Sequence, residues 1–162
     1  MREPKQVHIW SKPQFNSALG KLGINDKNVH ELPDVAFISI NDTMGQWNQS
    51  WFDEDHDNVL RLWFDDVETD MDLWSPTNTI HVEAFNSYQA QDILDFIKRN
   101  EHKKTFIVHC TAGISRSGAV GQFIADYFAC DKEEFKRMNP HICPNGLVSR
   151  MLNNLVNGYA ND

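Results

Sequence analysis

The chain has 162 residues, of which 41% are hydrophobic and 23% are charged, and these values fit one globular domain of ordinary size. A formal net charge of −8 disfavours long-range attraction to nucleic acid and to anionic lipid. No apolar run is long enough to cross a membrane, and the N-terminal residues MREPKQVHIW lack the apolar core of a signal peptide. We expect a single cytoplasmic domain over residues 1–162, monomeric by default, without a nucleic-acid or membrane partner.

The first third of the chain predicts two strands separated by a helix. Gln6–Trp10 (QVHIW) is predicted as a strand, after which Ser11 caps a short helix over Pro13–Leu22. Asp34–Ile40 (DVAFISI) is predicted as a buried strand, because this apolar run lies between a proline and a turn-forming Asn-Asp pair.

The middle of the chain predicts one more strand between two irregular segments. Met44–Asn58 is rich in Trp, Gln, Asn and Asp and is predicted as a loop. Val59–Phe64 (VLRLWF) is predicted as a strand that stops at two aspartates. Val67–Phe85 has no clear periodicity and several acidic residues, so we expect this segment to leave the core and run over the surface.

Helical spacing dominates the second half of the chain. Apolar residues at i, i+3, i+4 and i+7 predict a helix from Ser87, and a strand follows over Thr105–His109. Similar spacing predicts a helix after residue 115, and two further helices are predicted over Lys132–Met138 and Asn145–Val156. Strands separated by helices predict an α/β sandwich of the three-layer type, with a mostly parallel central sheet flanked by helices.

The cysteines and histidines predict no metal site. Cys110, Cys130 and Cys143 are an odd number without a Cys-x-x-Cys pair, which favours a reducing compartment and disfavours structural zinc. The seven histidines form neither His-x-x-x-His nor His-Glu-x-x-His.

The segment Thr105–Gly118 (TFIVHCTAGISRSG) has the features of an anion site. A buried strand ends at His109, a helix begins near residue 115 or 116, and mostly small residues connect them. In open α/β sheets, ligands bind beyond the carboxyl ends of strands, where helix N-termini direct N–H groups at them. We therefore expect a cup of backbone amides in which Gly113 takes the positive φ that such a loop often needs. Its members are Cys110, Thr111, Ala112, Gly113, Ile114, Ser115 and Arg116.

Cys110 and Arg116 determine the chemistry expected of this cup. N–H dipoles, a helix N-terminus and a nearby arginine favour the thiolate form of a cysteine, which is the nucleophile. The guanidinium of Arg116 can bind two oxygens of one tetrahedral anion. We predict attack of the thiolate on phosphorus, with Ser117 donating a hydrogen bond to the sulfur when it leaves. His109 is predicted to fix the loop through hydrogen bonds to the nearby backbone.

The motif HCTAGISRS resembles the His-Cys-x5-Arg-Ser signature of the protein tyrosine phosphatase superfamily, and its core is most similar to compact dual-specificity phosphatases and related bacterial and phage enzymes. The resemblance implies a phosphate-binding loop after a central strand and a two-step mechanism through a phosphocysteine, with no metal or other cofactor. It also implies Cys110 as the nucleophile, Arg116 as the phosphate binder, and a phosphorylated protein or peptide as the substrate.

The family's usual general acid is an aspartate on a loop after an upstream strand. Alignment by the end of the strand LRLWFDD assigns this role to Asp66, with Asp65 as the alternative. Asp70 and Asp72 are less favoured. The spacing to the cysteine is longer than in most dual-specificity enzymes, which fits an insertion around residues 75–85. Asn145, where the sequence resembles the family's terminal helix, either braces the phosphate loop or serves only as a helix N-cap.

Other functions stay open at this point. A module of the same fold that binds phosphopeptides without turnover needs the cup but no general acid. RNA 5′-phosphates and phosphoinositides are disfavoured as substrates, because the other loop residues are neutral and the protein is acidic. A sulfurtransferase also presents a cysteine at a helix N-terminus, but the pair Arg116-Ser117 argues against that activity. Phosphotyrosine is the first expected substrate, with phosphoserine and phosphothreonine as further ones.

Overall fold

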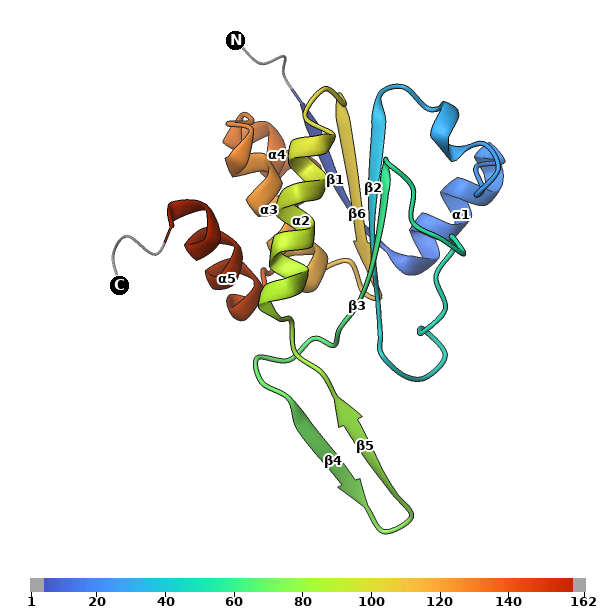
Figure 1. Cartoon of the computed structure of the whole chain (residues 1–162), viewed down its shortest axis with the longest axis vertical. Helices are drawn as coiled ribbons and strands as arrows, with labels where there is room; N and C mark the ends of the chain where they lie inside the picture. Colours follow the sequence, from blue (N-terminus) through green and yellow to red (C-terminus); the bar gives the residue numbers. More distant parts are fainter. Residues whose placement is uncertain (1–4, 159–162) are drawn as a thin grey trace.

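A four-stranded parallel sheet forms the centre of the structure, a computed structural model that describes residues 5–158 (Figure 1). Residues 1–4 and 159–162, which the predicted domain included, lie outside the described residues. Each neighbouring pair of strands is parallel, so the predicted α/β class with a mostly parallel sheet is confirmed. In spatial order the strands are β1 (Gln6–Ser11), β6 (Thr105–Cys110), β2 (Val35–Asn41) and β3 (Val59–Trp63).

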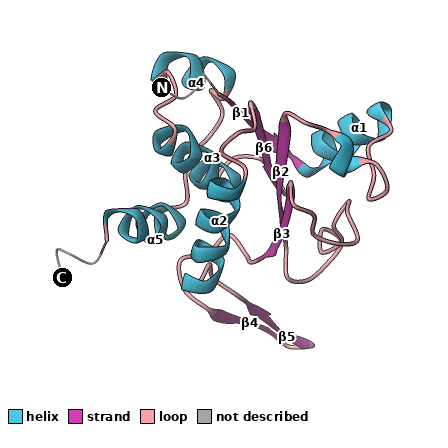
Figure 2. Ribbon diagram, turned by 45° about the horizontal axis from the view of Figure 1, so that its top comes forward, coloured by secondary structure: helices cyan, strands magenta, loops and turns pink. Residues whose placement is uncertain are grey.

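Helices cover both faces of this sheet (Figure 2). One face carries α1 (Lys12–Leu22), and the other carries α2 (Ser87–Arg99), α3 (Arg116–Tyr127), α4 (Lys132–Met138) and α5 (Gly146–Asn157). Four of these helices begin with a side chain that accepts a hydrogen bond from the first turn, and this explains why the predicted helix starts lie close to the observed ones. The capping residues are Ser11, Asn86, Asp131 and Asn145. Within residues 5–158, no helix combines the length and the apolar character needed to cross a membrane.

Alternate strand residues fill two separate apolar cores. In β6, Phe106 and Val108 belong to the core beneath α2 and α3, whereas Ile107 packs into the core beneath α1. In β2, Ile38 belongs to the core beneath α2 and α3, and Phe37 belongs to the core beneath α1. Successive side chains of a strand point to opposite faces, so a strand buried on both sides is apolar throughout. This is the reason that these strands were predictable as apolar runs.

The segment predicted to run over the surface, Val67–Phe85, contains a β-hairpin. Its antiparallel strands are β4 (Met71–Ser75) and β5 (Asn78–Val82), and the hairpin extends away from the sheet (Figures 1 and 2). The prediction missed it because each strand has only five residues and Trp74 interrupts the apolar–polar alternation of β4. The insertion expected around residues 75–85 therefore coincides with the second strand of a regular element.

The inner position of β6 determines where the cysteine loop lies. Ser11 at the end of β1 is in register with Cys110, and Ser39 of β2 is in register with His109. Because all four strands run in the same direction, the segments that follow β1, β2, β3 and β6 meet at one edge of the sheet.

Candidate active site

Cys110 is buried at the end of β6, and the loop that follows folds around its sulfur. The amide of Gly113 donates a hydrogen bond to Sγ at 3.2 Å. The hydroxyl of Ser117, in the first turn of α3, lies 3.0 Å from the same sulfur. The first N–H groups of α3 have no acceptor within the helix and point toward this loop. The sulfur thus lies within hydrogen-bonding distance of one backbone amide and one hydroxyl.

Gly113 is required by the path of this loop. Its φ is +73°, and a Cβ at this position would lie 2.5 Å from backbone atoms of Trp10 and Ser11. We expect Gly113→Ala to lower the free energy of unfolding by roughly 2–5 kcal/mol, the sum of the left-handed and overpacking costs. The control Gly23→Ala also has a positive φ, of +68°, but open space around it, so a cost of about 1–2 kcal/mol is expected. Urea unfolding of both variants measures the difference, and equal costs would contradict the close packing of the loop.

His109 connects the start of the loop to β2 through hydrogen bonds. It is fully buried, its Nδ1 donates to the carbonyl of Cys110 at 3.1 Å, and its Nε2 accepts from the hydroxyl of Ser39 at 2.6 Å. Burial lowers the pKa of His109 to about 3; the bond to Cys110 opposes this shift, and the charges of Lys12 and Arg116 add to it. The ring is therefore neutral at physiological pH.

This pKa predicts that the protein loses stability as the pH falls below about 6.5. Between the ordinary histidine pKa and about 3, the unfolded chain binds a proton that the native state does not bind, so the free energy of unfolding decreases with decreasing pH. Between pH 7 and pH 5 the loss from this one group is about 2 kcal/mol. Urea unfolding at both values should therefore show a larger loss for the wild type than for His109→Gln. An equal loss would mean that His109 is not the responsible group.

Arg116 is buried, and its guanidinium is held at the same loop. One terminal nitrogen donates to the carbonyl of Phe64 at 2.8 Å, and the other lies 2.9 Å from Oδ1 of Asp42. The same oxygen accepts from the hydroxyl of Thr111 at 2.7 Å, so the guanidinium and the start of the loop share one carboxylate. Nε of Arg116 is buried and has no hydrogen-bond partner among residues 5–158.

Lys12 adds a second buried cation at this edge. Its Nζ donates to Oδ1 of Asn41 at 2.8 Å and to the carbonyl of Trp47 at 2.7 Å, and its amide donates to the carbonyl of Thr111 at 3.1 Å. Burial lowers the pKa of Lys12 to about 8; the charge of Asp42 opposes this shift and that of Arg116 adds to it. Although the whole protein is acidic, two cations therefore lie next to the loop.

Asp66 lies at the rim of the loop. Its Oδ1 accepts from the hydroxyl of Ser115 at 2.8 Å and from Nδ2 of Asn145 at 2.9 Å. Asn145 also caps α5 by accepting from Val148, and its amide donates to the carbonyl of Ser115. The two readings of Asn145, loop support and helix N-cap, are therefore compatible in this geometry.

Asp65 points into the neighbouring loops. Its carboxylate accepts hydrogen bonds from the amide and hydroxyl of Thr43 and from the amide of Glu83. Burial alone would raise the pKa of Asp65, but these hydrogen bonds, led by the Thr43 hydroxyl, and the charge of Arg116 hold it below its ordinary value. A carboxyl group with a lowered pKa is a poor proton donor at neutral pH.

The two less favoured aspartates belong to the hairpin. Asp70 accepts from the amide of Ala84 at its base, and Asp72 pairs with His81 across the two strands. Neither has a contact with the cysteine loop among the hydrogen bonds of the described chain.

Sequence reasoning missed Asp42 and Lys12 as residues of this site. Asp42 was interpreted only as a turn former, and Lys12, just before the predicted helix Pro13–Leu22, was assigned no role. Both directly follow strands that neighbour β6 in the sheet, so their position beyond a carboxyl strand end was the available signal. That signal requires the strand order, which the sequence does not reveal.

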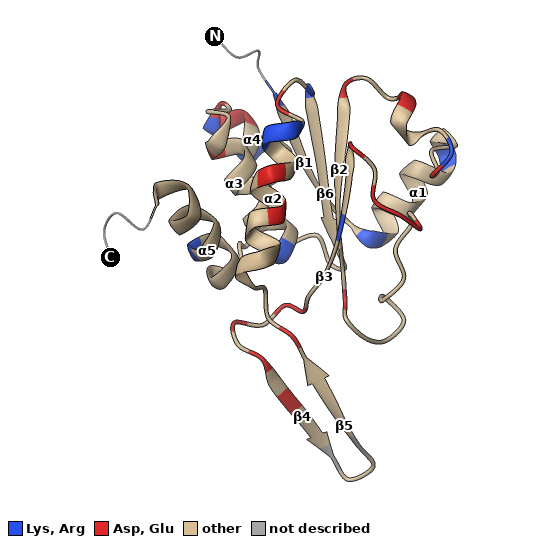
Figure 3. Ribbon diagram, in the orientation of Figure 1, with Lys and Arg blue, Asp and Glu red and all other residues tan. Residues whose placement is uncertain are grey.

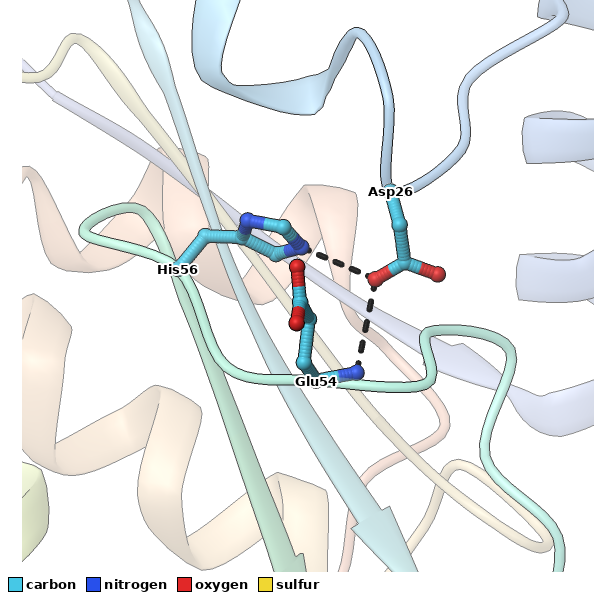
Figure 4. A group of neighbouring side chains, drawn as sticks. All are labelled: Asp26, Glu54 and His56. Carbon is cyan, nitrogen blue, oxygen red and sulfur yellow. Dashed lines mark hydrogen bonds and ion pairs between the residues drawn. The ribbon is translucent and has the colours of Figure 1, made fainter.

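A separate group of side chains lies away from the cysteine loop. Asp26, Glu54 and His56 are, within the described part of the chain, the one group whose ligand atoms are close enough to hold a metal ion (Figure 4). Oδ1 of Asp26 accepts from Nε2 of His56 at 2.8 Å, and the carboxylate also accepts from the amides of Asp53 and Glu54. These bonds connect two loops and account for the position of the Asp26 and His56 side chains.

No family model matches the chain, and no curated protein sequence matches it. Among solved structures, it is similar to a human tyrosine phosphatase-like serine/threonine/tyrosine-interacting protein, with a TM-score of 0.46 and 18% identity over 82% of this chain and 85% of the other. It is also similar to Tk-PTP in its active form, with a TM-score of 0.43 and 19% identity over 80% of this chain and 84% of the other.

Proposed function

We propose that this protein is a phosphatase that hydrolyses phosphate monoesters, first of all phosphotyrosine in proteins or peptides, through a phosphocysteine intermediate. The loop over residues 110–116 carries the proposal. The Gly113 amide and the Ser117 hydroxyl contact the sulfur of Cys110, and Arg116, at the end of the loop, has a buried Nε without a partner in the described chain. A buried guanidinium N–H without a partner is costly, and a bound oxyanion removes that cost.

In the first step, the thiolate of Cys110 attacks phosphorus and the ester P–O bond breaks. Negative charge on the equatorial oxygens is stabilised by the loop amides, the N-terminus of α3 and Arg116. The departing oxygen takes a proton from Asp66, whose carboxyl group is held at the rim of the loop by Ser115 and Asn145. The products are an alcohol or phenol and a phosphocysteine.

In the second step, water attacks phosphorus and the P–S bond breaks. Asp66, now a carboxylate, accepts a proton from the water. The hydroxyl of Ser117, 3.0 Å from the sulfur, donates a hydrogen bond to the departing thiolate. Inorganic phosphate leaves, and the enzyme returns to its starting state without a metal or other cofactor.

Asp42 and Lys12 act in this proposal as positioning residues. Asp42 orients the guanidinium of Arg116 and the hydroxyl of Thr111 through one shared oxygen. Lys12 fixes the loop after β2 by its bonds to Asn41 and Trp47, and so fixes Asp42 itself. Because Asp42 contacts a terminal nitrogen of Arg116, Nε of the same guanidinium stays available to bind substrate.

The alternative is a module that binds phosphopeptides without turnover, since the same cup would bind a phosphate group. Rapid quenching of the wild-type protein with para-nitrophenyl phosphate, followed by peptide mass spectrometry, separates the two. We expect steady release of nitrophenol and a transient phosphoryl group on the Cys110 peptide, with the peptides of Cys130 and Cys143 as unlabelled internal controls. Phosphopeptide binding with neither release nor label would instead identify the binding module.

A further inference from the structure

The hairpin β4–β5 has an apolar face of four residues, of which three are exposed and Val82 is half-buried. Met71 pairs with Val82 and Leu73 with Ile80, and directly opposite residues share a face of the sheet. Leu73 is 50% exposed, and Met71 and Ile80 are exposed as well. An isolated two-stranded hairpin is marginally stable in water, so a partner on this face would stabilise it.

Acidic residues outnumber basic ones at the hairpin, where Arg150 of α5 pairs with Glu68 and His81 of β5 pairs with Asp72. Figure 3 shows acidic residues on the hairpin and at its base, and no Lys or Arg on either. From Leu62 to Ile97 the sequence has no Lys or Arg and eight acidic residues. These are Asp65, Asp66, Glu68, Asp70, Asp72, Glu83, Asp92 and Asp95. The charge therefore favours a cationic occupant and disfavours a second copy of this chain, which would bring the same acidic charge.

The base of the hairpin is fixed to the segment that carries Asp66. The amide of Asp65 donates to the carbonyl of Glu83 at 2.7 Å, and the amide of Glu83 donates back to the Asp65 carboxylate at 2.9 Å. The amide of Ala84 donates to Asp70 at 2.7 Å and closes the base. Met71 follows Asp66 by five residues, so the apolar face begins within about 18 Å of the rim of the loop.

We propose that this apolar face, Met71, Leu73, Ile80 and Val82, docks the protein substrate beside its phosphorylated residue. The inference rests on the proposed function and adds the class of substrate. The docked segment is extended and basic, with apolar side chains against the hairpin face and Lys or Arg side chains toward the acidic base. About six extended residues span the distance from the loop to the face, so one short peptide can occupy both.

Two phosphotyrosyl peptides of equal length test the proposal. One has alternating Leu and Lys or Arg residues on both sides of the phosphotyrosine, and the other has Gly and Ser. Fluorescence anisotropy with the Cys110→Ser protein measures binding without turnover, and kcat/KM of the wild type measures turnover. We expect at least about a tenfold preference for the basic apolar peptide in both measurements, decreasing at high salt.

Leu73→Thr/Ile80→Thr should reduce this preference to within about twofold and leave the turnover of para-nitrophenyl phosphate unchanged. Trp74→Thr is the matched control, because Trp74 is 77% exposed and lies on the opposite face. The proposal is overturned if the wild type does not distinguish the peptides, if Trp74→Thr has the same effect as the double substitution, or if light scattering shows a dimer that the double substitution dissociates. Peptide preference in binding without any wild-type turnover would refute the phosphatase activity and leave the docking face supported.

Discussion

Arg116→Lys is expected to lower kcat/KM for para-nitrophenyl phosphate by about 10³, in the range found for arginines that stabilise transferring phosphoryl groups. The guanidinium has to contact Phe64, Asp42 and the phosphate at once, and its planar arrangement of donors permits this. A lysine ammonium keeps the charge, but its single nitrogen cannot contact Phe64, Asp42 and the phosphate at the same time. Steady-state kinetics of the variant measure the loss.

Arg61→Lys is the matched control for this substitution. Arg61 is paired with Asp55 on the surface, away from the loop, so its replacement should leave kcat/KM unchanged. A fall of less than tenfold in Arg116→Lys would show that charge alone is sufficient and that Arg116 does not bind the phosphate in the proposed way.

A feature of this molecule could be predicted from the sequence when it is formed by residues close together in the chain. The strand ending at Cys110, the loop and the start of α3 were predictable, because a buried strand, small residues and a helix N-terminus follow one another within about fourteen residues. The cores were predictable for the same reason, since apolar periodicity is local. The hairpin was not, because its alternation is short and interrupted at Trp74.

The residues that hold Arg116 and the loop in place from other strand ends were not predictable from local pattern at all. Asp42 contacts Arg116 from a different strand end, and Lys12 contacts the loop from a third. Whether these segments lie next to one another is decided by the order β1-β6-β2-β3, which depends on how the crossovers pass over the sheet. The same dependence explains why the sequence does not reveal the different surroundings of Asp65 and Asp66: one is bonded to Thr43 and the other to Ser115.

Asp66→Asn is expected to lower kcat/KM for phenyl phosphate by about 10²–10⁴, because the phenolate then leaves without a proton. The loss should be much smaller for para-nitrophenyl phosphate, whose leaving group is stable as an anion. A dependence on the leaving group is specific to a proton donor, and a merely structural role of Asp66 beside Ser115 and Asn145 would slow both substrates equally. Steady-state kinetics with the two esters measure this difference.

Asp65→Asn is the control, since Asp65 is the neighbouring carboxylate and is bonded to Thr43 and Glu83. Its replacement should lower the melting temperature, because the hydrogen bonds to a charged acceptor are weakened, and should slow the two esters by the same small factor. A large loss that depends on the leaving group in Asp65→Asn, with Asp66→Asn unaffected, would transfer the proton donor to Asp65. If neither variant showed such a dependence, the departing oxygen would receive its proton from another source, and the first step proposed here would have to be rewritten.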